Sequence, residues 1–419
     1  MKARTIGTLL LLALTICTMF ATRPSKAEPA GRGGQKFKAT QITVQLIPGG
    51  NIDRLNGRHG TRVVEQIEGT DSYLLELPNG VGVAEKLAGM IAESDLLVAA
   101  PNFNYQAPEI LQTSQAFIDQ TSQAFIDQTS QAFIDSQVPV SYTSQPAVSA
   151  LHLNEAQSYT LGQGVKVAVI DTGIDFQHPL FAGRIGWPVH DFVDGDEDPT
   201  DVAPGAGYGH GTFVAGLIAL SAPRATIMPL RAFSADGFGT SFNIAKAIRY
   251  AADNGARVIN MSFGMAEEDP LVKDAIVYAS AKTYMVAAAG NDNANYIHFP
   301  ASLGARTLSV TSTAIGDIKA PFSNFDSEMN VSAPGVAVYS AYPGKAWAYW
   351  SGTSFSTALV SGEAALLISL KPESTRTDLN SVIKASGTNI DLLNPIYARQ
   401  LGKVRVDYQA AVLKQLNLR

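Results

Sequence analysis

This sequence is poor in cysteine. Cys17 is the single cysteine among 419 residues, so the chain has no second thiol with which to form an internal disulfide. A chain of this length in which 46% of the residues are hydrophobic can bury a large core instead. We therefore expect two or three domains whose stability comes from core packing rather than from cross-links.

Charge is also scarce, and it is not clustered. Charged residues make up 16% of the chain, the formal net charge is −6, and there is no long run of lysine and arginine. Proteins that bind nucleic acid usually carry a basic patch or stripe, and this composition offers none. Nucleic acid is therefore not an expected partner.

The N-terminal apolar run is short for a membrane span. It covers about residues 6–20, follows Lys2 and Arg4, and precedes the small residues Ser25 and Ala27. A membrane-spanning helix needs about 20 apolar residues, whereas a signal peptide needs fewer. We expect residues 1–27 to be a signal peptide. The mature protein would then have no membrane anchor and would be secreted, either to a periplasm or outside the cell.

Residues 39–106 show the pattern of a small α+β domain. Residues 81–91 have helical spacing, and four other stretches read as strands. These stretches are residues 41–47, 61–67, 73–77 and 96–100. The length suits a βαββαβ domain of the ferredoxin-like kind, and none of its residues indicates chemistry.

Residues 107–149 are predicted to be a linker that contains an internal repeat. The segment from Thr113 to Gln120 recurs from Thr121 and again from Thr129, a period of eight residues. This period gives no continuous apolar face on a helix. A duplicated linker is favoured, and a specific docking element is the alternative.

Residues 150–419 alternate between buried apolar runs and helical patterns. Residues 165–170, 258–261 and 284–289 read as buried strands. The helical patterns cover residues 211–220, 242–254 and 269–283. Such alternation predicts an α/β domain with a mostly parallel sheet covered on both faces. Because ligands bind beyond the carboxyl ends of such strands, the residues that follow each strand are the candidates for chemistry.

Three residues in these places have side chains that could act together in catalysis. Asp171 follows the first buried strand, His210 stands between two glycines at the start of a helix, and Ser354 follows Gly352 at the start of another helix. Each alone has a simpler interpretation, as a turn residue, a structural histidine and a helix cap. Together they form a candidate triad, in which Asp171 orients His210 and His210 takes the proton of the Ser354 hydroxyl.

The strand 284–289 ends in Gly290 and Asn291. The Asn291 amide can donate a hydrogen bond to an oxyanion, and the Ser354 backbone N–H would be a second donor. A turn residue is the alternative interpretation of Asn291. Because a candidate triad is present, we favour the interpretation of Asn291 as a hydrogen-bond donor to the oxyanion.

These motifs resemble the signatures of the subtilisin-like serine proteases. The resemblance rests on Asp171-Thr172-Gly173, His210-Gly211-Thr212 and Gly352-Thr353-Ser354 in the order Asp, His, Ser, together with Gly290-Asn291. It covers roughly residue 150 to the C-terminus. It implies a three-layer subtilisin-like fold and a serine endopeptidase that hydrolyses peptide bonds through an acyl-enzyme and needs no cofactor for its chemistry.

The same resemblance implies further roles. Ser262, Phe263 and Gly264 would pair with an extended protein or peptide substrate, and Ala288, Ala289 and Gly290 would wall the pocket for the residue before the cleaved bond. The domain at residues 39–106 would be a pro-domain that inhibits the enzyme, assists its folding and is cut off by the enzyme itself.

Some features stay open at this stage. The acidic stretch from Asp191 to Asp201 is either a solvated loop or a structural calcium site whose ligands the sequence does not identify. Phe213, Phe355 and Ala358 depart from the residues most frequent in the family. The competing hypotheses are a non-catalytic peptide-binding protein on the same fold and a secreted esterase on a different fold.

Overall fold

The computed structural model describes residues 37–107, 117–118 and 138–417. The predicted signal peptide and most of the repeat segment lie outside the described residues. The described residues divide into two units. One comprises residues 37–104 with residues 240–242 and 269–271, and the other comprises the rest.

The first unit has the predicted βαββαβ order. Its antiparallel strands lie in the order β2-β3-β1-β4, and Ile42, Leu55 and Leu75 are in its core. The helix α2 had no clear apolar pattern in the sequence, because it is short and buries only Leu55. The elements are β1 (Phe37–Leu46), α2 (Ile52–His59), β2 (Arg62–Gln66), β3 (Ser72–Glu76), α3 (Val83–Met90) and β4 (Leu96–Gln106).

The second unit is built on a parallel sheet in the order β13-β12-β11-β10-β6-β8-β7. The strand order reverses between β6 and β10, which is where ligands bind in open α/β sheets. The strands are β6 (Lys166–Asp171), β7 (His190–Asp191), β8 (Thr226–Arg231), β10 (Val258–Met261), β11 (Tyr284–Ala288), β12 (Thr307–Thr313) and β13 (Val331–Pro334).

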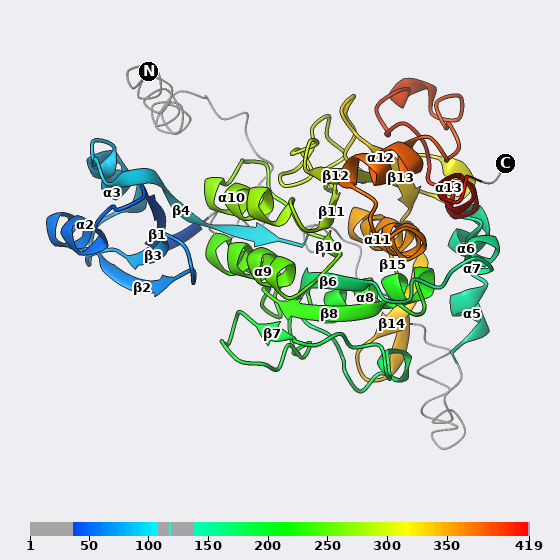
Figure 1. The fold of residues 1–419 in the computed structure, drawn as a ribbon, viewed down its shortest axis with the longest axis horizontal. Coiled ribbons are helices and arrows are strands. Elements are labelled where there is room, and N and C mark those ends of the chain that lie inside the picture. Colours follow the sequence, from blue (N-terminus) through cyan, green and yellow to red (C-terminus); the bar gives the residue numbers. More distant parts are fainter. Residues whose placement is uncertain (1–36, 108–116, 119–137, 418–419) are drawn as a thin grey trace. The chain divides into compact units, whose positions relative to one another are not determined.

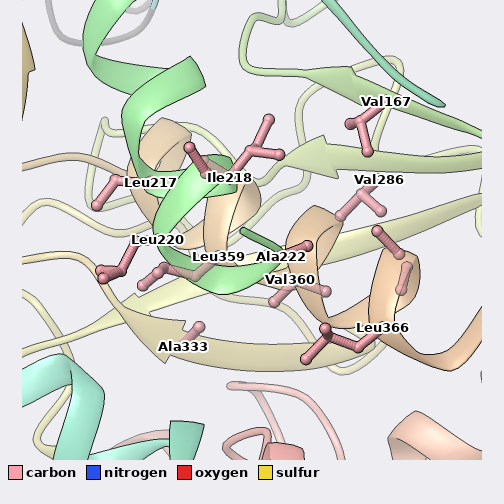
Figure 2. Packing of buried hydrophobic residues seen from close by; sticks show 14 of the residues in the cluster. Val167, Leu217, Ile218, Leu220, Ala222, Val286, Ala333, Leu359, Val360 and Leu366 are labelled. Carbon is pink, nitrogen blue, oxygen red and sulfur yellow. The ribbon is translucent and has the colours of Figure 1, made fainter. Parts of the chain in front are cut away.

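Helices cover both faces of this sheet, as predicted for a three-layer α/β fold (Figure 1). On one face α8 and α11 pack against each other and against the strands, and α9 and α10 lie on the other face. Figure 2 shows Leu217 of α8, Leu359 and Val360 of α11 and Val286 of β11 as members of one buried cluster. The four helices are α8 (His210–Ser221), α9 (Ser241–Asp253), α10 (Pro270–Ala279) and α11 (Thr353–Leu370).

Smaller elements surround this core. Tyr142, in the stretch predicted as linker, is buried in the core and donates a hydrogen bond to the Gly216 carbonyl at 2.5 Å. Two residues of the repeat segment, Phe117 and Ile118, pair antiparallel with β15. These elements are β5 (Phe117–Ile118), α5 (Val140–Thr143), α6 (Pro146–Ala150), α7 (Leu153–Gln157), β9 (Phe238–Thr240), β14 (Val338–Tyr342), β15 (Ala346–Trp350), α12 (Arg376–Lys384) and α13 (Tyr408–Gln415).

Helix α11 is the central helix of the second unit. It is the one helix in the described part of the chain that is long and apolar enough to cross a membrane, and 89% of its apolar window is buried inside the protein. A core helix passes the same test of length and composition. Its contacts with α8 and with five strands of the sheet identify it as such a helix.

One residue of α11 is unusual for a core helix. Glu363 is buried, and neither of its carboxyl oxygens has a hydrogen-bond partner among the described residues. Burial raises the pKa of Glu363 well above its usual value, the Asp407 charge raises it further, and Arg405 opposes the shift. The buried carboxyl group is therefore expected to keep its proton in the folded state at a pH where it ionises in the unfolded chain.

This difference predicts how stability depends on pH. Above the unfolded-state pKa, the unfolded chain binds one proton fewer than the folded protein, so the free energy of unfolding falls by about 1.4 kcal/mol per pH unit until the folded-state pKa is reached. Glu363→Gln removes this loss. We expect the variant to be more stable than the parent at pH 8 but not at pH 4, in urea unfolding. Glu373→Gln, at an exposed position, is the control. Equal pH slopes for parent and Glu363→Gln would contradict the prediction.

Candidate active site

Asp171 ends β6 and lies against His210. Its Oδ1 atom accepts a hydrogen bond from the Thr172 N–H at 2.8 Å and lies 2.7 Å from His210 Nδ1. A carboxylate can only accept, so the hydrogen of the second bond is on Nδ1. In a neutral ring, Nε2 then has the lone pair that a general base needs.

The aspartate and histidine motifs can pack together because Gly211, the residue at their point of contact, has no side chain. Gly211 is the second residue of α8, and a Cβ atom placed on it would lie only 2.1 Å from the Gly173 carbonyl oxygen. Any larger residue would push the first turn of α8 away from the end of β6. The glycine after the histidine is thus a steric requirement for the contact between Asp171 and His210.

A second buried carboxylate, Asp201, supports this turn. It accepts hydrogen bonds from the Thr212 hydroxyl at 2.7 Å, the Gly209 N–H at 3.1 Å and the Thr172 hydroxyl at 3.2 Å. Burial raises the pKa of Asp201 to about 7, despite these hydrogen bonds. In the sequence, Asp201 is the last residue of the acidic stretch from Asp191 to Asp201. Its position eight residues before Gly209 was the one signal that set it apart.

Ser354 lies in the first turn of α11 and is bonded to Ser262, just after the end of β10. Its Oγ donates a hydrogen bond to the Ser262 carbonyl at 3.1 Å, and the Ser262 hydroxyl donates to the Ser354 carbonyl at 3.0 Å. The ring of the next residue, Phe355, lies 5.6 Å from the His210 ring between centroids. The structure therefore brings the start of α11 beside the start of α8.

Two of the departures from the family pattern pack against each other. Phe213 and Phe355 have ring centroids 4.6 Å apart, and Trp350 lies 5.7 Å from Phe213 and 5.4 Å from Phe355. The His210 ring completes this group, at 5.7 Å from Trp350. An aromatic cluster thus encloses the buried side of the imidazole and limits the positions that it can take.

Asn291, three residues after the end of β11, is tied to the residue before Ser354. Its Oδ1 atom accepts hydrogen bonds from the Thr353 backbone N–H at 3.0 Å and from the Thr353 hydroxyl at 2.8 Å. These two bonds fix which end of the amide is the oxygen. The Nδ2 group, the only donor of this side chain, is held in a fixed direction by the same contacts.

The edge formed by Ser262, Phe263 and Gly264 pairs with an extended segment of the second unit. Gln106 and Gly264 form an antiparallel bridge, in which the Gly264 N–H donates to the Gln106 carbonyl at 3.4 Å. Tyr105 packs edge-on against Phe263 with ring centroids 5.9 Å apart. One main-chain hydrogen bond and one ring contact thus join this edge to residues 105–106.

A buried polar network under this edge was not foreseen from the sequence. The Ser361 hydroxyl donates to Asn260 Oδ1 at 2.9 Å, and Asn260 Nδ2 donates to the Ser262 hydroxyl at 2.9 Å. The Ser262 hydroxyl in turn bonds to the Ser354 carbonyl. One polar residue within the apolar strand β10 was the available signal.

The acidic loop does not gather its carboxylates around one point. Asp191 and Asp194 both bind the Arg231 guanidinium, and the other Asp191 oxygen accepts from the Val193 N–H at 2.7 Å. No group of three or more His, Cys, Asp or Glu side chains is placed to hold a metal within the residues that the structure describes. In this arrangement the two carboxylates bind one guanidinium.

Arg231 predicts a large effect on stability. Asp191 is buried, so Arg231→Met leaves an uncompensated charge, which typically costs about 3–5 kcal/mol. Asp194→Asn is the control, because the Asp194 side chain is 62% exposed and should contribute less than about 1 kcal/mol.

Urea unfolding measures the free energy of unfolding of the parent and of both variants. Each measurement is made once with calcium chloride and once with a chelator. An Arg231→Met protein no less stable than Asp194→Asn would contradict the prediction, and a loss of parental stability in chelator would show that the protein binds a structural ion.

Comparison with known proteins identifies the family of this chain. Residues 162–403 match the subtilase family, Peptidase_S8. Thermitase of Thermoactinomyces vulgaris is 40% identical over 221 residues, which cover 50% of this chain and 76% of thermitase. Subtilisin BL of Lederbergia lenta is 35% identical over 243 residues, which cover 56% of this chain and 87% of that protein.

A solved structure extends the comparison to the fold. The chain is similar to fervidolysin from Fervidobacterium pennivorans, described as a keratinolytic enzyme related to subtilisin, with a TM-score of 0.72 and 21% identity. The likeness covers 91% of this chain and 62% of fervidolysin, and at this identity it bears on the fold alone. The family match spans more than half of the chain, so this protein belongs to the subtilase family of serine-type proteases.

Proposed function

We propose that this chain is a secreted serine endopeptidase in which Asp171, His210 and Ser354 form the catalytic triad. The observation that carries the proposal is the 2.7 Å contact between Asp171 Oδ1 and His210 Nδ1, with the His210 ring beside the first turn of α11. Burying a carboxylate beside a histidine costs free energy of folding. Such pairs are common at active sites, where they perform catalysis.

The proposed reaction begins when Ser354 Oγ attacks the carbonyl carbon of the substrate and His210 Nε2 takes the hydroxyl proton. Asp171 orients the ring and stabilises the imidazolium that forms. The carbonyl oxygen gains the negative charge and binds Asn291 Nδ2 and the Ser354 backbone N–H. When the intermediate collapses, His210 gives the proton to the leaving amine, and water then hydrolyses the acyl-enzyme by the same steps.

Substrate binding is assigned to two edges of the site. We propose that Ser262, Phe263 and Gly264 add an extended substrate chain by β-pairing, because the same edge pairs with Gln106. Ala288, Ala289 and Gly290 are proposed to wall the pocket for the residue before the cleaved bond. The substrates are therefore proteins or peptides in extended conformation.

Maturation and export are further parts of the proposal. Residues 39–106 are proposed to act as an inhibitory pro-domain and folding assistant that the enzyme removes itself, with residues 107–149 as a linker to the catalytic domain at 150–419. A signal peptide at residues 1–27 would direct secretion. The proposed chemistry uses no cofactor, and the chelator comparison for Arg231 tests for a structural calcium ion.

A non-catalytic peptide-binding protein is the alternative function, favoured by the peptide-like pairing at Gly264. A fluorophosphonate probe separates the two, since it reacts only with an activated nucleophile. We expect labelling of Ser354 on peptide mapping, together with turnover of peptide substrates. A protein that binds peptides but neither reacts with the probe nor cleaves them would favour the alternative, and labelling with turnover of esters alone would indicate an esterase.

A further inference from the structure

We propose that His298 limits the side chain accepted immediately before the cleaved bond to small residues. The inference rests on the proposed function, because it takes residues 262–264 and 288–290 as the walls of that pocket. Walls of alanine and glycine alone predict an open pocket. The position of the His298 ring predicts a shallow one.

His298 lies against the glycines of both walls. A Cβ atom on Gly264 would be 2.8 Å from His298 Cβ and 3.2 Å from its Nδ1, and a Cβ atom on Gly290 would be 2.8 Å from its Cγ and its Nδ1. Contacts under 3.0 Å are shorter than carbon atoms tolerate. The imidazole therefore occupies the space beside Gly264, and it shares the space beside Gly290 with the Asn324 amide, whose Nδ2 would lie 2.4 Å from that Cβ atom.

The ring is held in this position from behind. His298 Nε2 lies 2.6 Å from Asp292 Oδ2, and the His298 backbone N–H donates to the Ala289 carbonyl at 3.1 Å. Tyr296 also donates to Asp292, at 2.7 Å. Burial raises the pKa of Asp292, but the hydrogen bond and charge of His298 outweigh this and lower the pKa to about 2. An ionised Asp292 accepts, so Nε2 carries the proton and the ring orientation is fixed.

The opposite nitrogen indicates that a ligand completes the site. His298 Nδ1 is buried and has no hydrogen-bond partner among the residues that the structure describes. A buried polar atom without a partner is costly and calls for an explanation. Nδ1 is among the ring atoms nearest to Gly264 and Gly290, so it is the polar atom that a small hydroxyl side chain, such as that of serine, would meet on entering between these walls. A large aromatic side chain has no room beside the ring.

The test compares peptide p-nitroanilides that differ only in the residue before the cleaved bond. We expect the parent enzyme to cleave after alanine and serine with kcat/KM about tenfold or more above cleavage after phenylalanine. His298→Ala should shift the phenylalanine-to-alanine ratio upward by about tenfold or more. Asp292→Asn, which keeps the ring but loosens it, should shift the ratio in the same direction by a smaller factor.

His152→Ala is the matched control, since His152 also pairs with an aspartate, Asp407, at 2.7 Å. It should leave the ratio unchanged. Fluorophosphonate labelling of Ser354 establishes that each variant is folded. If His298→Ala does not fold, the ratio measured for Asp292→Asn decides the test. A parent enzyme that prefers phenylalanine, or variants with the parental ratio, would overturn the role of His298. A parent enzyme that cleaves none of the peptides would instead count against the proposed function.

Discussion

Ser354→Ala should abolish peptide cleavage. Without Oγ no bond to the substrate carbonyl carbon can form, and His210 has no hydroxyl proton to take. Removal of the corresponding nucleophile in subtilisin lowers kcat on the order of a millionfold, and we expect a similar loss here. Residual activity would come from substrate binding and the oxyanion donors alone. Turnover of a peptide p-nitroanilide measures the loss.

The same variant tests self-processing. If the protease removes its own N-terminal domain, the Ser354→Ala protein should retain residues 39–106, and mass spectrometry of the purified protein would detect them. Ser369→Ala is the control, because it makes the same change at the far end of α11, where the hydroxyl bonds to the Leu366 carbonyl. A processed and active Ser354→Ala protein would disprove the assignment of the nucleophile.

Asn291→Asp should produce the second-largest loss. The substitution keeps an oxygen that can accept from the Thr353 N–H and hydroxyl, but it replaces the Nδ2 donor with a second acceptor. The oxyanion then loses a hydrogen bond and faces a negative charge. We expect kcat to fall by about 10²–10³, the typical cost of one such donor. Because the donor acts on the transition state, KM should change little.

The control for this variant lies two residues further along the chain. Asn293→Asp makes the same isosteric change at an exposed position, where the side-chain oxygen accepts from Lys319 Nζ at 2.7 Å and a carboxylate can still do so. It should keep near-parental kcat. If Asn291→Asp raised KM with kcat unchanged, Asn291 would be a substrate-binding residue rather than an oxyanion donor.

The architecture of the second unit could be predicted because buried parallel strands leave a strong pattern. The apolar runs that contain β6, β10 and β11 alternate with helical patterns, and their carboxyl ends indicated where Asp171 and Asn291 would stand. Topology then places these ends at one edge of the sheet. The positions of Asp171 and Asn291 at the strand ends could therefore be predicted from the pattern of apolar residues in this one sequence.

Other parts of the site depend on contacts that a sequence does not record. Phe213 and Phe355 look like independent departures from the family pattern until the structure shows their rings packed together. The partners of Asp201 come from the end of β6 and from the start of α8, and the contact of His298 with Gly264 and Gly290 depends on how two strand ends turn. Such contacts follow from tertiary packing, so local patterns could not predict them.

Helix α11 has a consequence for the synthesis of this protein. It begins at Thr353, after every strand of the large sheet, yet it packs against five of those strands and against α8. Until α11 has been synthesised, these strands lack the helix that packs against them, so the core cannot close early. Because the same helix carries Ser354, a nascent chain receives its proposed nucleophile only when it can fold.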